Sequence, residues 1–255
     1  MATREEMLDR IRRALGRPQT GRPGVVTDAR SLPPARLDGV MPPIEKPDYL
    51  PKFEAELEKL AGATYRAANA AQLDETLRSI VGDSSAVVLS RNPVLKQLRL
   101  AEKLRAWGAA VEEWPEKVGD PEPGRRAEAG AEAERSEAFK GASFQARVGI
   151  TGVDCVLAET GSLVLTSRTE GSQLASLAPP VHVALYRESQ VAASLDDVLE
   201  ALNLSGGPAA PDGGRSVVFI TGTSRTADIE QVLIRGVHGP REVHAILVGE
   251  ACLGL

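Results

Sequence analysis

The chain has 255 residues, of which 42% are hydrophobic and 25% charged, and this balance is typical of a soluble globular protein with a sizeable core. A formal net charge of −5 and an aromatic content of 4% argue against a nucleic-acid partner, because phosphate binding needs a basic surface and single strands need aromatic platforms. The two cysteines, Cys155 and Cys252, are too few for a disulfide framework, a four-cysteine zinc site or a conventional iron–sulfur cluster, and we expect buried free thiols.

Residues 1–50 are predicted to form a short helix followed by an extended arm, ahead of one α/β domain at 51–255. Thr3 and Glu6 have the spacing of a capping box, and the apolar residues that follow recur at helical spacing. Eight of the 17 prolines then fall at positions 18–51, which favours an extended segment. The charged N-terminus lacks the apolar core of a signal peptide, and no run of about 18 apolar residues occurs, so we expect a cytoplasmic protein without a membrane span.

Helices and strands alternate in the first part of this domain. The expected elements are helices at 53–60 and 70–81, a strand at 86–90, a helix at 92–108 and a strand at 109–114. Asn92 and Pro93 have the residue types of a helix cap and first turn, and Gly108 is a typical helix end. Residues 116–137 are rich in Glu, Ala, Gly and Arg, which indicates an exposed loop passing into a helix.

The second part has a denser strand pattern. Strands are expected at 147–152, 154–159, 162–167, 181–186, 216–221 and 242–248, and helices near 195–203 and 226–235. The alternation of strands and helices favours an α/β sheet with crossover connections. The predicted fold is a three-layer α/β/α domain around one mixed, largely parallel sheet, with the N-terminal helix and arm outside it.

The stretch FITGTSRTADIE (219–230) is a candidate anion site. An apolar strand ends at Gly222, and a hydroxyl-rich loop leads into the helix predicted near 226. Ser224 or Thr226 can cap that helix, and Arg225 adds a guanidinium suited to carboxylate or phosphate. The alternative is that the hydroxyls only cap a helix and that Arg225 is solvated, and spacing alone leaves both open. The stretch matches neither GxxxxGK[ST] nor GxGxxG.

The stretch GVHGPRE (236–242) supplies a loop histidine. His238 lies beside Gly239 in a turn, where it can act as a hydrogen-bond donor, a proton carrier or a ligand, or can simply be satisfied by backbone carbonyls. His182 and His244 lie inside apolar strands and are expected to be packed there. Three histidines so far apart predict no metal site.

The stretch DCVLAETGSLVLTS (154–167) reads as two strands around a turn at Thr160 and Gly161, flanked by Glu159 and Ser162. A tight turn needs no ligand, and this segment alone favours that interpretation. Glu159, however, ends an apolar strand, where partial burial would raise its pKa and suit it to proton transfer or acyl capture. Ligands of α/β sheets bind at strand carboxyl ends, so Glu159, the 221–226 loop and His238 form one site if they share that edge.

Taken together, AETGSLVL, the PPVH segment, ITGTSRTADIE and GVHGPRE resemble the lactate utilization protein C family, the stand-alone LUD-domain proteins (LutC/YkgG). The resemblance covers roughly the last 110 residues and is most specific in the close pairing of SRTADIE with GVHGPRE. Thr223 stands where the family has proline. The resemblance implies the fold class of ribose-phosphate isomerases, glucosamine-phosphate deaminases and CoA transferases. It also implies a role in the oxidation of L-lactate to pyruvate, alongside LutA-like and LutB-like iron–sulfur proteins that carry the cofactors this chain lacks.

The family motifs map onto a set of candidate residues. Candidate catalytic residues are Glu159, Asp228 and His238, and candidate ligand- or anion-binding residues are Thr160, Gly161, Ser162, Gly222, Thr223, Ser224, Arg225, Thr226, Gly239 and Arg241. The expected ligand is a small carboxylate or a phosphorylated metabolite. Two alternatives stay open: a transferase or hydrolase of CoA esters that uses Glu159 as its nucleophile, and a regulatory module that binds a metabolite without turnover. Homo-oligomerisation is also left open.

Overall fold

The computed structural model describes residues 44–83, 85–115, 126–202, 216–226, 234–236 and 238–254. The predicted N-terminal helix, most of the predicted arm and the candidate residue Asp228 lie outside the described residues.

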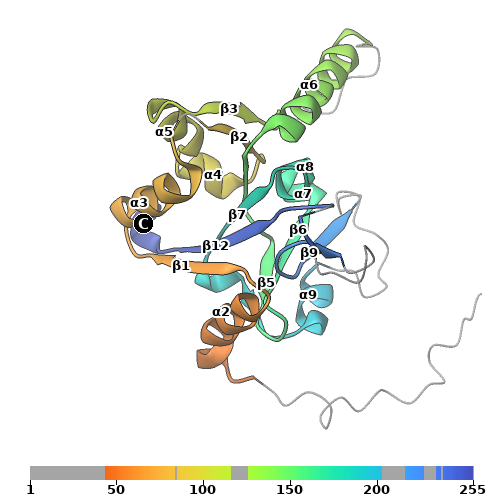
Figure 1. The fold of residues 1–255 in the computed structure, drawn as a ribbon. Coiled ribbons are helices and arrows are strands. Elements are labelled where there is room, and N and C mark those ends of the chain that lie inside the picture. The colour runs from red at the N-terminus through yellow and green to blue at the C-terminus, as the bar shows by residue number, and fades with distance from the viewer. Residues whose placement is uncertain are drawn as a thin grey trace, which may run out of the picture. The chain divides into compact units, whose positions relative to one another are not determined.

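A six-stranded parallel sheet forms the centre of the domain (Figure 1). Its strands, in spatial order, are β1 (Ala63–Ala67), β12 (Glu242–Val248), β7 (Val181–Tyr186), β4 (Val148–Thr151), β2 (Ala86–Leu89) and β3 (Ala110–Glu113). Every residue of β4 and β7 is buried, which explains their continuous apolar sequences, since a parallel sheet is covered on both faces.

A smaller sheet carries the remaining predicted strands. Its order is β8 (Val191–Ala192), β5 (Cys155–Leu157), β6 (Ser162–Thr166) and β9 (Val217–Ile220). Strand β6 pairs antiparallel with both β5 and β9, and β5 pairs parallel with β8. The prediction of one sheet was therefore wrong, because the 160–161 turn folds β6 back on β5 and the apolar residues of this hairpin pack over the central sheet.

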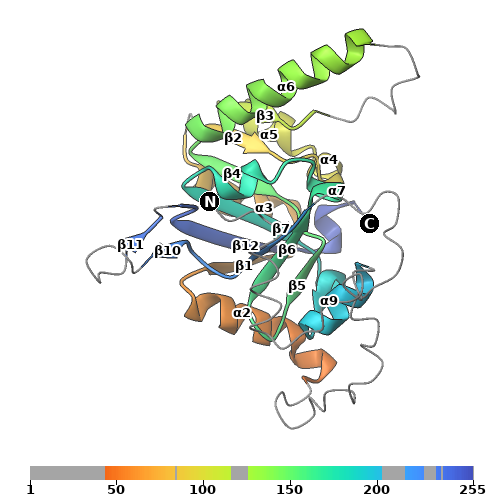
Figure 2. The ribbon, with the colours of Figure 1, turned by 90° about the vertical axis from the view of Figure 1, so that its right-hand side faces the viewer.

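Helices α3 (Ala70–Val81), α4 (Pro93–Gln97) and α5 (Leu100–Ala106) cover one face of the central sheet, and the small sheet with α2 (Tyr49–Lys59) and α6 (Arg126–Gln145) covers the other, as Figures 1 and 2 show. The first face packs its alternate strand residues, including Val87, Leu89, Val183 and Leu185, against α3, α4 and α5. On the other face, Ala184 and Tyr186 pack against α2 and the small sheet. Val88 packs there against Phe139 of α6. The predicted fold class, mixed α/β with a largely parallel sheet, is confirmed.

Short elements complete the described fold. They are α7 (Ser167–Glu170), α8 (Leu174–Leu177), α9 (Leu195–Ala201), β10 (Arg225–Thr226), β11 (Ile234–Arg235) and the 3-10 turns at Lys46–Asp48, Glu188–Gln190 and Glu250–Cys252. The helix predicted at 92–108 is two helices, α4 and α5. Arg99 separates them, with a left-handed φ of 51° that no α-helix accommodates.

The helix predicted near 226–235 is wrong at both of its ends, where the structure has short strands. Strands β10 and β11 pair antiparallel, with Arg225 opposite Arg235 and Thr226 opposite Ile234. The Gly236 N–H donates to the Ser224 carbonyl at 2.9 Å and closes this ladder. The described ends are thus held as a β-ribbon, and residues 227–233 lie outside the described residues.

Candidate functional site

The GVHGPRE loop lies at the amino edge of the central sheet, not at the expected carboxyl edge. It immediately precedes β12, and the main-chain N–H groups of Arg241 and Glu242 both donate to the Pro180 carbonyl, at 2.8 and 3.2 Å. Pro180 in turn precedes β7, the neighbour of β12. The parallel pairing of β7 and β12 therefore fixes His238, Gly239 and Arg241 at their amino ends.

The 221–226 loop joins this cluster through its backbone. The Ser224 N–H donates to the Pro240 carbonyl at 2.9 Å. Gly239 lies so close that an added Cβ would be 3.2 Å from the Ser224 Cβ. The two motifs of the family resemblance thus come together in space, although Arg225 and Thr226 lie in a strand and not at the start of the predicted helix.

An open cleft of about 590 Å³ lies beside these loops. Its lining residues are Gly236, His238, Gly239, Arg241, Phe144, Leu177, Ala178 and Pro180. The Phe144 side chain is 67% exposed and that of Leu177 39% exposed, so the apolar wall is open to solvent. A guanidinium and an imidazole facing apolar side chains suit an anion that carries a short apolar part.

Arg241, rather than Arg225, supplies the guanidinium of this cleft. Its side chain lies across Gly236, where an added Cβ would come within 1.9 Å of the Arg241 Cγ. Gly236 also has a φ of 73°, so both its conformation and the space that it leaves require glycine. Arg225 is exposed, and its Nε lies 3.5 Å from the Thr223 hydroxyl. The roles of Arg225, Thr223 and Thr226 in binding stay predictions.

Hydroxyl groups connect the ETG turn to the end of β9. The Thr160 and Ser162 hydroxyls share a hydrogen bond of 2.7 Å, and Ser162 shares another of 2.6 Å with Thr221. Gly161 (φ 66°) packs against helix α2, where an added Cβ would be 2.3 Å from the Leu57 nitrogen. These contacts give Thr160, Gly161 and Ser162 a structural role, and ligand binding by them stays a prediction.

Two further candidate residues are also engaged in the fold. The Glu159 carboxylate accepts a hydrogen bond of 3.0 Å from the Leu195 N–H at the start of α9. Gly222 has a φ of 84° and contacts the end of α2, where an added Cβ would be 2.6 Å from the Leu60 Cβ. Glu159 therefore contacts the first turn of a helix, and its role as a nucleophile stays a prediction.

His182 and His244 are packed strand residues, as predicted. His182 is fully buried, its Nε2 lies 2.9 Å from the Thr151 hydroxyl, and burial, together with the nearby His244, lowers its pKa to about 3. His182 is therefore neutral at physiological pH. The His244 ring stacks on Tyr65, with Nδ1 3.2 Å from the tyrosine hydroxyl and Nε2 3.2 Å from the Glu242 carboxylate.

The carboxyl edge of the sheet holds a polar cluster that the sequence analysis missed. Strand β2 leads through α4 and α5 to β3 on one side, whereas its neighbour β4 leads through the small sheet to β7 on the other. Such a switch of direction opens a crevice at the strand ends where ligands of α/β sheets bind. The loops that flank it are 90–92 after β2 and 152–154 after β4.

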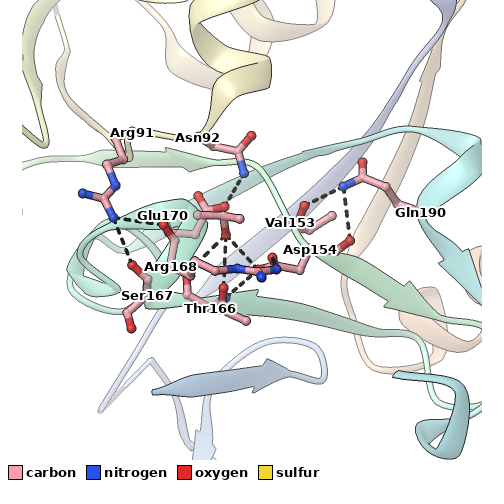
Figure 3. Close-up of polar contacts among 10 residues, drawn as sticks. Arg91, Asn92, Val153, Asp154, Thr166, Ser167, Arg168, Glu170 and Gln190 are labelled. Carbon is pink, nitrogen blue, oxygen red and sulfur yellow. Dashed lines mark hydrogen bonds and ion pairs between the residues drawn. The ribbon is translucent and has the colours of Figure 1, made fainter. Parts of the chain in front are cut away.

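Glu170 lies between these two loops. Its side chain is fully buried, and its carboxylate accepts hydrogen bonds from the Ser90 hydroxyl, the Asn92 side-chain amide and the Gly152 N–H, the last at 3.2 Å. Burial raises the pKa of this carboxyl, Asp154 adds to the rise, and the hydrogen bonds from Ser90 and Asn92 oppose it. Figure 3 shows the Asn92 amide directed at Glu170.

A second carboxylate fixes the loop after β4. Asp154 accepts from the Thr166 N–H at 2.7 Å and the Thr169 hydroxyl at 2.8 Å, and Arg168 lies 3.9 Å away (Figure 3). The Gln190 amide donates to the Val153 carbonyl at 2.6 Å. Glu170 and Asp154 therefore fix the loops after β2 and β4, because each carboxylate accepts several hydrogen bonds from main-chain and side-chain donors.

The comparison with known families decides the classification, since a model of the LUD domain matches residues 50–248. The chain belongs to the LUD-domain family. The predicted family resemblance is thereby confirmed.

Curated relatives of this LUD-domain protein include several named lactate utilization protein C. One from Deinococcus radiodurans is 36% identical over 101 residues, which cover 39% of this chain and 45% of that protein. One from Bacillus subtilis is 35% identical over 108 residues, which cover 42% of this chain and 44% of that protein. These two matches span less than half of either relative. One from Exiguobacterium sp. is 27% identical over 257 residues, covering 97% of this chain and 96% of that protein.

A solved structure shares the fold of this LUD-domain protein. A DUF162 family protein from Deinococcus radiodurans superposes with a TM-score of 0.52 at 20% identity, covering 81% of this chain and 100% of that one.

The cysteines of the LUD-domain protein are free and partly buried. Burial raises the pKa of Cys155 to about 12, with a further rise from Asp154, and burial also raises the pKa of Cys252. Burial therefore disfavours the thiolate form of both cysteines, which is the nucleophilic form. Within the described ranges, no three His, Cys, Asp or Glu side chains gather closely enough to hold a metal ion. None of the helices described is long and apolar enough to cross a membrane.

Proposed function

We propose that this LUD-domain protein acts in the oxidation of L-lactate to pyruvate as the component that binds a small carboxylate, while LutA-like and LutB-like iron–sulfur partners accept the electrons. Family membership, with a relative named lactate utilization protein C aligned along nearly the whole chain, is the observation that carries the proposal. The cysteine count supports a division of labour, because two cysteines are too few to ligate a conventional cluster by themselves.

The amino-edge cleft is the proposed carboxylate site. The Arg241 guanidinium can donate two parallel hydrogen bonds to a carboxylate, and the backbone bond from Arg241 to the Pro180 carbonyl fixes the point from which its side chain extends. Phe144 and Leu177 give the short carbon chain an apolar wall. His238 lies in the same cleft, where an imidazole can take up the proton that leaves the lactate hydroxyl. The hydrogen on the lactate Cα leaves as a second proton to solvent, to which the cleft is open, and the two electrons pass to the iron–sulfur partners.

Arg241→Gln is expected to weaken L-lactate or pyruvate binding by about 10- to 100-fold, the loss that corresponds to one charged hydrogen-bonding group. Stability should change little, because the structural bonds of Arg241 use its main chain. Calorimetric titration of the purified protein measures the affinity, and growth on L-lactate measures the function. Lys59→Gln is the control, since Lys59 is an exposed cation on α2 paired with Glu56.

Two results would contradict the proposal. The first is unchanged L-lactate and pyruvate affinity in Arg241→Gln together with normal growth on L-lactate. The second is normal growth of a deletion strain that has no redundant lactate system. Co-purification with cysteine-rich iron–sulfur proteins from cells grown on L-lactate is the matching positive result.

A further inference from the structure

A second cleft opens at the carboxyl edge of the central sheet, the edge opposite the proposed lactate site. It has a volume of about 430 Å³ and begins at Leu89 and Ser90, where β2 ends. Apolar residues, including Leu95, Leu100 and Trp114, and six charged residues complete its lining. It therefore lies at the carboxyl ends of β2 and β3, beside α4 and α5, at the sheet edge where ligands of open α/β sheets bind.

The cleft has a surplus of positive charge, although the whole protein is negatively charged. Four basic side chains (Arg91, Lys96, Arg99 and Arg105) and two acidic ones (Glu102 and Glu113) line it, a surplus of two positive charges in a chain with a net charge of −5. A surplus of this kind concentrates small anions in a concave site. A single carboxylate is matched by one guanidinium, whereas this surplus calls for a ligand with more than one negative charge.

Two of the four cations form exposed ion pairs within the cleft, and Arg105 also donates to the Val111 carbonyl at 3.2 Å. Arg99 pairs with Glu102, and Arg105 pairs with Glu113 at 2.8 Å, with all four side chains solvent-exposed. Exposed ion pairs contribute little to stability, so an incoming multivalent anion can replace the acidic partner at small cost. These two guanidinium groups are therefore available to a ligand.

Arg91 is oriented by the fold instead. Its Nη2 donates to the Arg168 carbonyl at 2.9 Å and lies 3.5 Å from the Ser167 carbonyl (Figure 3). Its N–H donates to the Glu170 carbonyl at 3.2 Å. A guanidinium has five N–H donors, so the bonds to these carbonyls leave others for a ligand while they hold the side chain in place. Preorganised donors of this kind favour binding because little entropy is lost.

The backbone at Arg99 supports a binding role for its side chain. Arg99 has a left-handed φ of 51°, a conformation that is unfavourable for residues other than glycine. No buried contact offsets this cost, because the side chain is 73% exposed and its ion pair is at the surface. Glycine would adopt the backbone conformation of the α4–α5 turn without strain. We therefore attribute the arginine at this position to the charge that it contributes to the cleft.

We propose that this carboxyl-edge cleft binds a phosphate-bearing small-molecule anion through Arg91, Arg99 and Arg105. The site is independent of the lactate cleft, since the two open at opposite ends of the parallel strands. Phosphate groups fit better than a monocarboxylate because each carries up to two negative charges and several acceptor oxygens for guanidinium forks.

Titration of the full chain with inorganic pyrophosphate tests the site. We expect saturable binding that weakens as the salt concentration rises. Arg99→Gly should lower the affinity by about 10-fold while the unfolding midpoint stays equal or rises, because glycine relieves the left-handed strain. Arg105→Gln should lower the affinity similarly without a backbone change.

A matched control exists in the same chain. Ala61 also has a left-handed φ, of 62°, but lies before β1 at the amino edge. Ala61→Gly should raise stability as Arg99→Gly does and leave pyrophosphate affinity unchanged. The proposal is overturned if pyrophosphate shows no saturable binding at millimolar concentration, or if Arg99→Gly and Arg105→Gln both bind it as the wild type does. Neither outcome bears on L-lactate binding at Arg241, so the two proposals fail separately.

Discussion

Glu170→Ala is expected to destabilise the fold by about 3–5 kcal/mol, the cost typical of removing one partner from a buried charged network. The carboxylate accepts hydrogen bonds from Ser90, Asn92 and Gly152 in a site closed to solvent. Alanine leaves all three donors unsatisfied, and each buried donor without a partner costs about 1–3 kcal/mol. The loops after β2 and β4 should then separate at their shared edge.

Urea unfolding followed by circular dichroism measures this loss. Glu75→Ala is the matched control, since Glu75 is an exposed carboxylate on α3 and its removal should change the free energy of unfolding by less than about 0.5 kcal/mol. A loss below about 1 kcal/mol in Glu170→Ala would show that the three donors find other partners. That result would contradict the role of Glu170 as the connection between the two loops.

The pH dependence of stability should also identify Glu170. Burial raises the pKa of its carboxyl above the ordinary 4.5, so the folded protein binds this proton more tightly than the unfolded chain does. The contribution of Glu170 to the free energy of unfolding is therefore largest below pH 4.5 and falls as the pH rises through the raised pKa. Glu170→Gln cannot titrate, so its stability deficit against the wild type should shrink from pH 4 to pH 8. A deficit that grows over this range would mean a lowered pKa.

Local sequence signals predicted most of the elements but failed where distant residues decide the structure. Asn69 and Asn92 cap α3 and α4 through their side chains, and Asn92 was recognised as a cap because such residue types are specific. Strand β1, with sequence ATYRA, was missed because it is partly exposed and pairs with a single neighbour, β12. The break at Arg99 was missed because only glycine normally signals a left-handed residue.

The sequence motifs predicted the candidate residues of the site, but not the edge of the sheet at which they lie. The sequence left open whether the 221–226 loop and the His238 loop share one edge, and the Ser224 N–H bond to the Pro240 carbonyl brings these two loops together. The edge of the sheet was wrong, because it depends on strand order and direction, which no short segment encodes. The burial of Glu170 could not be predicted from the sequence for the same reason. It is one acid in the polar stretch SRTEGS and is buried only because three loops meet around it.

Gly161→Ala is the second substitution with a large expected effect, about 3 kcal/mol or more of lost stability. Two costs add at this position. The left-handed φ of 66° penalises any L-residue by about 1–2 kcal/mol. The new Cβ would also be 2.3 Å from the Leu57 nitrogen and 2.7 Å from the Glu56 carbonyl carbon, backbone atoms of α2 that cannot rotate away. The turn and the helix must therefore separate.

Gly108→Ala isolates the first of these costs, because Gly108 has a φ of 89° and an added Cβ there meets no atom within 4 Å. We expect Gly108→Ala to lose only about 1–2 kcal/mol, and the difference between the two variants measures the close approach of the ETG turn to α2. Separation of the turn should also break the hydroxyl row from Thr160 through Ser162 to Thr221. Equal losses in the two variants would show that the turn moves freely on α2, and the glycine of the ETG motif would then need an explanation other than packing.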